Sequence, residues 1–329
     1  MDIFYAYIFA VYIILYAMKL ATTSTNGQLK QVQPSSQQII DAFIADLDVK
    51  PASKALYERT LKVYLDWMQS KRYTHADMNR EKVLQYKSEQ IARGCSPLTV
   101  ASYLTVVRKL YGWAESNGWL SFNPSKDIKT PPKDQVFQKE VLTDAETDQL
   151  RNYFKSKSLR DYAIAFLVQR TGMRTIEVTR ANIEDLTIRE GERVLLVQGK
   201  GRDRKGEAVY ISADVYSAIM EYLETRPATK GKEPLFTSCS DKNRGQRLTT
   251  RFISGLLKEG LRAIGLDDRR YSAHSLRHTV GTKIYELTGD IHQVQLALRH
   301  RSPVTSQIYA RKKIEQSAIR KSPLKLLGA

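Results

Sequence analysis

Apolar residues recur at helical spacing through the first third of the chain. From residue 35 onward they fall three and four positions apart, which places them on one face of each helix. The two leading groups are Ile39, Ile40, Phe43, Ile44 and Leu47, then Leu56, Leu61, Tyr64, Leu65 and Met68. Two more helices are predicted, one closing at Gly94 and one that opens at Ser96-Pro97 and closes at Gly118. Residues 35–122 therefore predict a compact domain of four helices.

The pattern changes in the second half of the chain. Residues 123–140 are rich in Pro and Lys and predict an extended basic linker. Thr143 and Glu146 then form a capping-box pattern ahead of a helix, and a further apolar helix ends at Gly172.

A β-hairpin is predicted next. Two β-rich runs, residues 193–198 and 207–211, flank a turn rich in glycine and charge. Helical spacing returns after about residue 245. We therefore expect a fold that is mainly α with a small antiparallel β-sheet, and a second domain over residues 141–329.

The start of the chain is unusual. Residues 3–18 are all apolar or aromatic, yet this run is shorter than the roughly 20 residues that span a bilayer. Three interpretations remain: a start assigned too early, with the protein beginning at Met18; a short membrane anchor; or a helix packed on the body. We favour the first, because the polar residues 19–38 are typical of a flexible N-terminus. Residues 1–34 are thus expected to lie outside the folded domains.

Composition narrows the class of partner. The chain is 42% hydrophobic and 26% charged, a balance that argues against a disordered or fibrous protein. Its formal net charge of +17, with the larger excess of Lys and Arg in the second half, indicates a polyanionic partner. Nucleic acid is the first candidate and a membrane surface the second.

Motifs for metals and nucleotides are missing from the sequence. Cys95 and Cys239 match neither a disulfide framework nor a zinc spacing, which fits a reducing, cytoplasmic setting. The histidines contain no HExxH pair, and the chain has no Walker or GxGxxG loop. We expect chemistry that needs no metal and no cofactor.

Four short pieces of the second half carry candidate chemistry. They are Arg174 with Glu177 after a glycine turn, Lys200 in the hairpin, His274 and Arg277 on one helix face, and His300 ahead of a helix that carries Tyr309. Each alone is typical of surface pairs or packing. Together they supply a nucleophile, two forked cations for phosphate oxygens and a proton donor, which transfer of a phosphodiester to a protein requires.

In this order, the residues resemble the tyrosine recombinase, or phage integrase, family. The resemblance covers residues from about 35 to 320 and implies a helical core-binding domain over residues 35–122 and a catalytic domain over residues 141–329. It also implies the roles that follow. Tyr309 would attack the scissile phosphate and join the DNA 3′ end, and Arg174 and Arg277 would hold the phosphate. Lys200 would protonate the leaving 5′ oxygen, His274 and His300 would assist, and Glu177 would orient Arg174.

One position departs from the family pattern. The family commonly reads Leu-Gly-His before the tyrosine, whereas this chain reads Leu298-Arg299-His300, followed by Arg301. We expect Arg299 to be tolerated as a basic addition near the phosphate.

Contacts to double-stranded DNA with inverted-repeat half-sites are also expected. The candidates for phosphate contacts are Lys54, Lys62, Arg72, Lys87, Arg108, Lys109, Arg202, Arg299 and Arg301. The resemblance further suggests a tetramer on DNA, held by exchange of the C-terminal tail with its Leu324, Leu326 and Leu327.

The predicted activity is site-specific recombination, for integration or excision of a mobile element or a related reaction. Two alternatives stay open. A type IB topoisomerase-like enzyme would nick and reseal DNA without partner sites, and a catalytically dormant DNA-binding protein would keep only the fold.

Overall fold

The computed structural model describes residues 22–25, 28–31, 35–132, 140–199, 201–227 and 231–309, with only the backbone for the first two segments. The chain divides into two compact units, residues 1–135 and 136–329. The apolar run at residues 3–18 lies outside the described residues. None of the helices in the described segments combines the length and the apolar character needed to cross a membrane.

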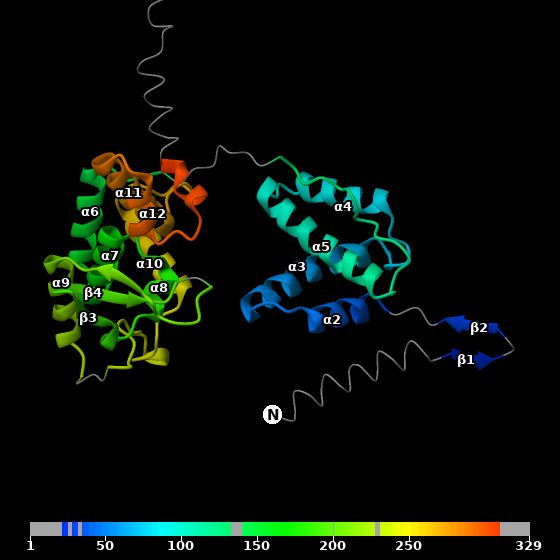
Figure 1. Ribbon diagram of the computed structural model, residues 1–329, viewed down its shortest axis with the longest axis horizontal. Helices are drawn as coiled ribbons and strands as arrows, with labels where there is room; N and C mark the ends of the chain where they lie inside the picture. Colours follow the sequence, from blue (N-terminus) through cyan, green and yellow to red (C-terminus); the bar gives the residue numbers. More distant parts are fainter. Residues whose placement is uncertain are drawn as a thin grey trace, which may run out of the picture. The chain divides into compact units, whose positions relative to one another are not determined.

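The first unit is built from helices (Figure 1). Its described residues form the helices α2 (Ser36–Asp46), α3 (Pro51–Ser70), α4 (Arg80–Ala92) and α5 (Pro97–Ser116). Within the segment expected as a tail, the short strands β1 (Thr22–Thr25) and β2 (Gln28–Gln31) pair antiparallel.

Local signals in the sequence explain where these helices begin. Ser35 caps α2 in a full capping box with Gln38, and Ser96 caps α5 with Pro97 in its first turn. The apolar faces meet in a core rich in aromatic side chains, among them Tyr64, Trp67, Tyr86 and Tyr111. The four-helix prediction for this part of the chain agrees with the structure.

The second unit is mainly helical and carries a small sheet (Figure 1). Its helices are α6 (Asp144–Lys155), α7 (Leu159–Thr171), α8 (Thr175–Arg180), α9 (Ala213–Glu224), α10 (Thr250–Ala263), α11 (Ala273–Thr288) and α12 (Ile291–Leu298). The described part of this unit also contains the 3-10 turns η1 (Ile183–Asp185), η2 (Asp241–Asn243) and η3 (Pro303–Thr305).

The sheet has strand order β3-β4-β5 and is antiparallel throughout. Its strands are β3 (Leu186–Arg189), β4 (Glu192–Val197) and β5 (Glu207–Tyr210). The hairpin prediction matches β4 and β5, whereas β3 was not predicted. This strand has only four residues and its Ile188 is exposed, so it shows no apolar pattern. The chain turns from β3 into β4 through Glu190 and Gly191, both with positive φ.

Helix α7 is the centre of the second unit. Its middle is apolar on all sides: residues 163–168 are all buried, as expected for a segment covered all round. It packs against α6, α9 and α11. At its C-terminal end Gly172 turns the chain with φ of 60°, in the left-handed region that favours glycine. This turn delivers Arg174 to the start of α8.

Candidate active site

Tyr309 lies at the edge of the second unit's core, against α11 and α12. It follows η3 in a helical turn in which its backbone N–H donates to Ser306 O at 3.1 Å. Its side chain is only 6% exposed and packs with Val294 and Leu298. Burial raises the pKa of the Tyr309 phenol to about 12, although the charges of Arg277 and Arg174 act to lower it. The phenol is therefore protonated at neutral pH.

His300 faces the same phenol from the loop after α12. Its ring lies nearly parallel to that of Tyr309, with 6.4 Å between the ring centroids. Its Nδ1 shares a hydrogen bond of 2.7 Å with Ser306 Oγ, which fixes the ring. Burial, and after it the charges of Arg277 and Arg174, lower the pKa of His300 to about 4. The imidazole is thus neutral at pH 7.

Arg277 is a buried cation of the site. It lies on α11 with 2% exposure, and it donates to Gly172 O at 2.7 Å and to Leu298 O. Burial and the nearby Arg174 charge lower its pKa to about 10, so it stays cationic at neutral pH. Its partners in these hydrogen bonds are carbonyl oxygens rather than a carboxylate. Through them it ties together the ends of α7 and α12.

Arg174 occupies the N-cap of α8 and pairs with Glu177 one turn on. Its Nη1 donates to Glu177 Oε1 at 2.8 Å, and its backbone N–H donates to Glu177 Oε2 at 2.9 Å. Glu177 is fully buried. Burial alone would raise the pKa of Glu177, but the charges of Arg299 and Arg174 and the hydrogen bonds from Arg174 lower it below its ordinary value.

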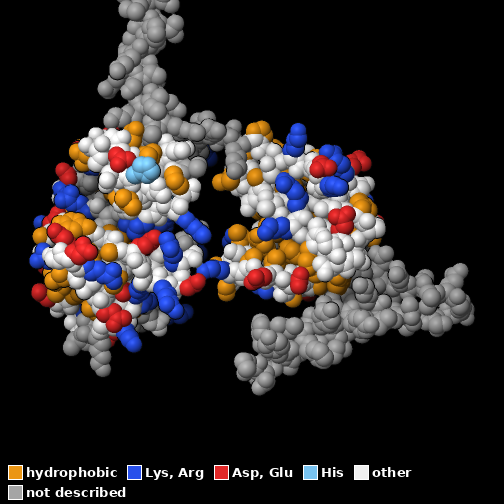
Figure 2. All heavy atoms as spheres, viewed as in Figure 1, with side chains coloured by type: hydrophobic (Ala, Val, Ile, Leu, Met, Phe, Trp, Pro, Cys, Tyr) orange, Lys and Arg blue, Asp and Glu red, His pale blue; other side chains and the backbone are white. Residues whose placement is uncertain are grey.

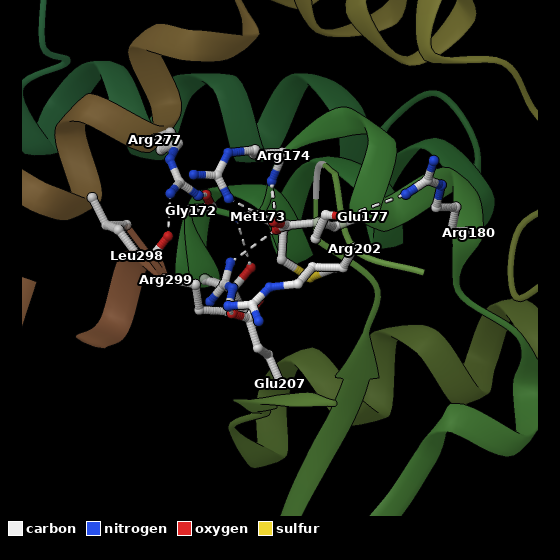
Figure 3. A network of polar contacts seen from close by, with 12 residues as sticks. Gly172, Met173, Arg174, Glu177, Arg180, Arg202, Glu207, Arg277, Leu298 and Arg299 are labelled. Atoms are coloured by element: carbon white, nitrogen blue, oxygen red, sulfur yellow. Dashed lines mark hydrogen bonds and ion pairs between the residues drawn. The ribbon is translucent and has the colours of Figure 1, made fainter. Parts of the chain in front are cut away.

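Arg299 completes this cluster from the end of α12. Its Nη2 donates to Glu177 Oε2 at 3.0 Å, and its side chain is 6% exposed. Figure 3 shows the guanidinium groups of Arg174, Arg277 and Arg299 gathered around the Glu177 carboxylate. The residue expected as a basic addition near a phosphate is therefore held in a buried ion pair.

Two histidines of α11 lie in line with the phenol. His274 is exposed, and its ring lies 5.4 Å from that of His278. The His278 ring in turn lies 5.6 Å from the ring of Tyr309. Sequence reasoning selected His274 and missed His278, although the spacing of four residues on one helix was available as a signal.

The hairpin of β4 and β5 approaches the cluster, but Lys200 at its tip lies outside the described residues. Its neighbours are anchored: Arg180 of α8 donates to Gly199 O at 3.3 Å, and Arg202 pairs with Glu207 at 3.0 Å. Lys205 in the same turn pairs with the buried Asp185. Figure 3 shows the pair of Arg202 and Glu207.

The remaining basic residues selected from the sequence lie at the surface or near it. Figure 2 shows Lys and Arg side chains on the visible faces of both units. Lys62, Arg72, Lys109, Arg202 and Arg301 are exposed, and Lys54, Lys87 and Arg108 are half-buried. Several have partners: Lys62 pairs with Asp66, Lys87 donates to Lys129 O, Lys109 lies over the Tyr57 ring, and Arg202 pairs with Glu207.

Within the described residues, no group of three or more His, Cys, Asp or Glu side chains is placed to hold a metal ion.

Known proteins are similar to this chain in sequence and in fold. Residues 140–316 match the phage integrase family. Tyrosine recombinase XerC of Caldanaerobacter subterraneus subsp. tengcongensis is 33% identical over 231 residues, which cover 68% of this chain and 62% of that protein. Tyrosine recombinase XerD of Caulobacter vibrioides is 27% identical over 282 residues, which cover 82% of this chain and 90% of that protein.

Solved structures resemble the fold over most of its length. The XerH site-specific recombinase bound to palindromic difH, in a post-cleavage complex, superposes with a TM-score of 0.70 at 20% identity, covering 96% of this chain and 94% of that one. A lambda integrase dimer bound to a COC′ core site gives 0.65 at 16% identity, with 83% and 97% covered.

The family match spans more than half of the chain. The chain therefore belongs to the phage integrase family, and it is a tyrosine-type site-specific recombinase.

Proposed function

We propose that this protein cuts and rejoins DNA strands at a specific site through a 3′-phosphotyrosyl intermediate on Tyr309. The observation that carries the proposal is a buried tyrosine placed under the charges of two arginines, Arg277 and Arg174. Arg277 donates its hydrogen bonds to two backbone carbonyl oxygens, and neither of these partners carries a charge that would neutralise the guanidinium group. A phosphodiester is the substrate that matches this arrangement.

The charge of the cluster favours an anion. Arg174, Arg277 and Arg299 carry three positive charges, and Glu177 between them carries one negative charge. Charge that develops on the nonbridging oxygens during transfer would meet fixed guanidinium groups in a water-poor setting, where such groups are most effective. The forked geometry of Arg suits these oxygens better than a point charge.

The transfer step exchanges one ester bond for another. The phenol oxygen of Tyr309 bonds to phosphorus while the bond from phosphorus to the 5′ oxygen breaks, so the energy of the phosphodiester is kept. The phenol proton, held at a pKa of about 12, leaves during the attack and needs a nearby base. His300, neutral with a pKa of about 4, and His274 would assist with this proton.

Lys200 would give the proton that the 5′ oxygen needs, and attack by a 5′ hydroxyl would reverse the step. Rejoining therefore requires no ATP. Glu177 would hold Arg174 in place through its two hydrogen bonds.

The surrounding units would hold the DNA. We propose residues 35–122 as a core-binding domain and residues 141–329 as the catalytic domain, with the linker at 123–140. The candidates Lys54, Arg72, Arg108 and Lys109 would contact phosphates from the first, and Arg202 and Arg301 from the second. XerH is described in complex with palindromic DNA, which supports inverted half-sites as the partner here.

Assembly of four protomers through the C-terminal tail belongs to this proposal, as does a role in integration or excision of a mobile element. Deleting residues 319–329 is expected to leave DNA binding within about threefold and to abolish strand exchange, since tail docking affects protomer pairing and not the grip on phosphates. Gel-shift and recombination assays on the same preparation check this. Unimpaired recombination by the truncated chain would rule out the tail exchange.

Recombination itself is tested on a plasmid that carries two copies of the DNA flanking this gene, compared with a plasmid that lacks them. Deletion or inversion between the two copies is the expected result. Relaxation of both plasmids without rearrangement would instead support the topoisomerase-like alternative, and binding without either product would support a dormant protein.

A further inference from the structure

Arg299 occupies a backbone position that disfavours it. It is the C-cap of α12, with φ of 54° and ψ of 50°. This left-handed region suits glycine, because a side chain there crowds the following carbonyl group. A glycine at position 299 would therefore relax the backbone, so the arginine has no backbone reason to be there.

Its side chain is buried, and both of its Nη atoms have partners, whereas its buried Nε has none among the described residues. Nη2 donates to Glu177 Oε2 at 3.0 Å, and Nη1 donates to Ala297 O at 2.7 Å in its own segment. A buried guanidinium is unfavourable unless it is paired, and here the pair is with a carboxylate that is itself fully buried. The contact thus joins two groups that are both costly to bury alone.

The pair links the two halves of the candidate site. Glu177 holds the backbone and side chain of Arg174 at the start of α8. Arg299 stands between Leu298, whose carbonyl oxygen accepts from Arg277, and His300, whose ring lies beside Tyr309. A single carboxylate therefore connects Arg174 to the loop that carries His300.

We propose that Arg299 is a positioning residue for strand cleavage, which fixes the His300 loop to the Glu177–Arg174 pair. The inference rests on the proposed function, in which Arg174 and Arg277 hold the scissile phosphate. Arg299 acts through Glu177: it keeps that carboxylate ionised and oriented, and it leaves Arg174 free to direct its remaining N–H groups toward the phosphate.

A pH profile separates this role from a purely structural one. The Arg299 charge is the largest influence that favours the ionised form of Glu177. Without it, the pKa of Glu177 rises, Glu177 becomes protonated at a higher pH, and Arg174 loses its partner there. Arg299 also helps to lower the pKa of His300. When Arg299 is removed, the acid limb of the pH profile of the cleavage rate should therefore move toward neutral pH.

The test compares three variants of the full chain with the wild type. Arg299→Gly removes the pair and relaxes the backbone, and Arg299→Lys keeps the charge. Arg244→Gly is the matched control, because it removes an arginine from an exposed pair with Asp241 in the same unit. Single-turnover formation of the covalent adduct is measured against pH, on a nicked duplex made from the DNA that flanks the gene.

We expect the unfolding temperature of Arg299→Gly to lie within a few degrees of that of the wild type. Its cleavage should be at least about tenfold slower, and the acid limb of its pH–rate profile should lie at higher pH. In Arg299→Lys the acid limb should return part of the way to its wild-type pH, and Arg244→Gly should match the wild type in both rate and pH profile. Wild-type rates and an unshifted limb in Arg299→Gly would overturn the proposal, as would an equal loss in Arg244→Gly.

A second readout does not depend on cleavage. Carbon NMR of the Glu177 carboxyl group follows its titration in the wild type, Arg299→Gly and Arg299→Lys. A pKa that rises in Arg299→Gly and returns in Arg299→Lys supports the coupling, and an unchanged pKa refutes it. If the wild type itself forms no adduct, the proposed function fails, and this titration still decides whether Arg299 controls Glu177.

Discussion

The phenol of Tyr309 rests directly on the backbone of α11. A Cβ atom added at Gly281 would lie 2.6 Å from Tyr309 Cζ and 2.8 Å from Leu298 Cδ1, far inside contact distance. The Tyr309 ring can therefore pack this close to α11 only because residue 281 is a glycine, with no Cβ atom. The position of the Tyr309 ring therefore depends on Gly281, a residue that has no side chain to take part in the reaction.

Gly281→Ala should displace the Tyr309 ring and slow cleavage by about 100-fold, because misplacement of a reacting group by about 1 Å has that order of effect. The adduct-forming rate is the measurement. Gly255→Ala is the control: it makes the same change on the exposed side of α10, where a Cβ atom would meet nothing within 4 Å. Equal rates in the two variants would contradict this account of the ring's position.

Some of the contacts among these residues could be expected from the sequence, and others could not. Arg174, Arg277, His300 and Tyr309 follow a known order along the chain, and the structure brings them together. The pairing of Arg299 with Glu177 could not be predicted, since 122 residues separate them and nothing in a linear pattern shows which carboxylate a buried arginine will reach. The position of Lys200 remains a sequence prediction.

At the scale of elements, a buried polar cluster joins α3, α5 and the loop between α3 and α4. Tyr111 OH shares hydrogen bonds with Tyr64 OH at 2.9 Å and with His75 Nδ1 at 3.0 Å. Burial raises the pKa of both tyrosines and lowers the pKa of His75 to about 4. The first unit is thus packed around a histidine that stays neutral at pH 7.

This cluster should make the first unit sensitive to acid. In the unfolded chain His75 takes up a proton near pH 6.5, whereas in the folded chain it does so only near pH 4. Stability is therefore lost as the pH falls from about 6.5 to about 4, by on the order of 3 kcal/mol from this group. Below about pH 4 this contribution changes no further.

Denaturant titrations at several pH values check the prediction. Tryptophan fluorescence reports on the first unit, because Trp67, Trp113 and Trp119 are the tryptophans of the whole chain. His75→Gln should flatten the pH dependence, whatever it does to stability at pH 7. His292→Gln, which changes an exposed histidine of the second unit, should leave the dependence as it is. Parallel curves for the wild type and His75→Gln would contradict the role of His75.

Most elements were predictable because their signals are local. The caps at Ser96 and Thr143 and the left-handed turn at Gly172 are set by neighbouring residues, and the structure has all three. Strand β3 was not predictable, because its four residues form a strand only through pairing with β4. Short edge strands depend on their partner more than on their own pattern.

For the whole molecule, the net charge of +17 predicts binding that depends strongly on salt. Each phosphate contact should contribute about 0.9 to the slope of log affinity against log salt concentration. Lys54→Gln should reduce that slope by about one contact if Lys54 touches a phosphate. Fluorescence anisotropy on a labelled duplex over a range of salt concentrations measures it, and a flat response would contradict a phosphate-gripping surface.

The most direct test of the central claim is capture of the covalent intermediate. The full chain is expressed in cells that carry the DNA flanking its gene, the cells are denatured rapidly, and any DNA attached to the protein is sequenced beside a Tyr309→Phe control. The account predicts DNA joined through its 3′ end at one locus, with none attached in the control. DNA that stays attached in Tyr309→Phe, or its absence from the wild type under conditions that trap a known recombinase, would contradict the assignment of Tyr309 as the nucleophile.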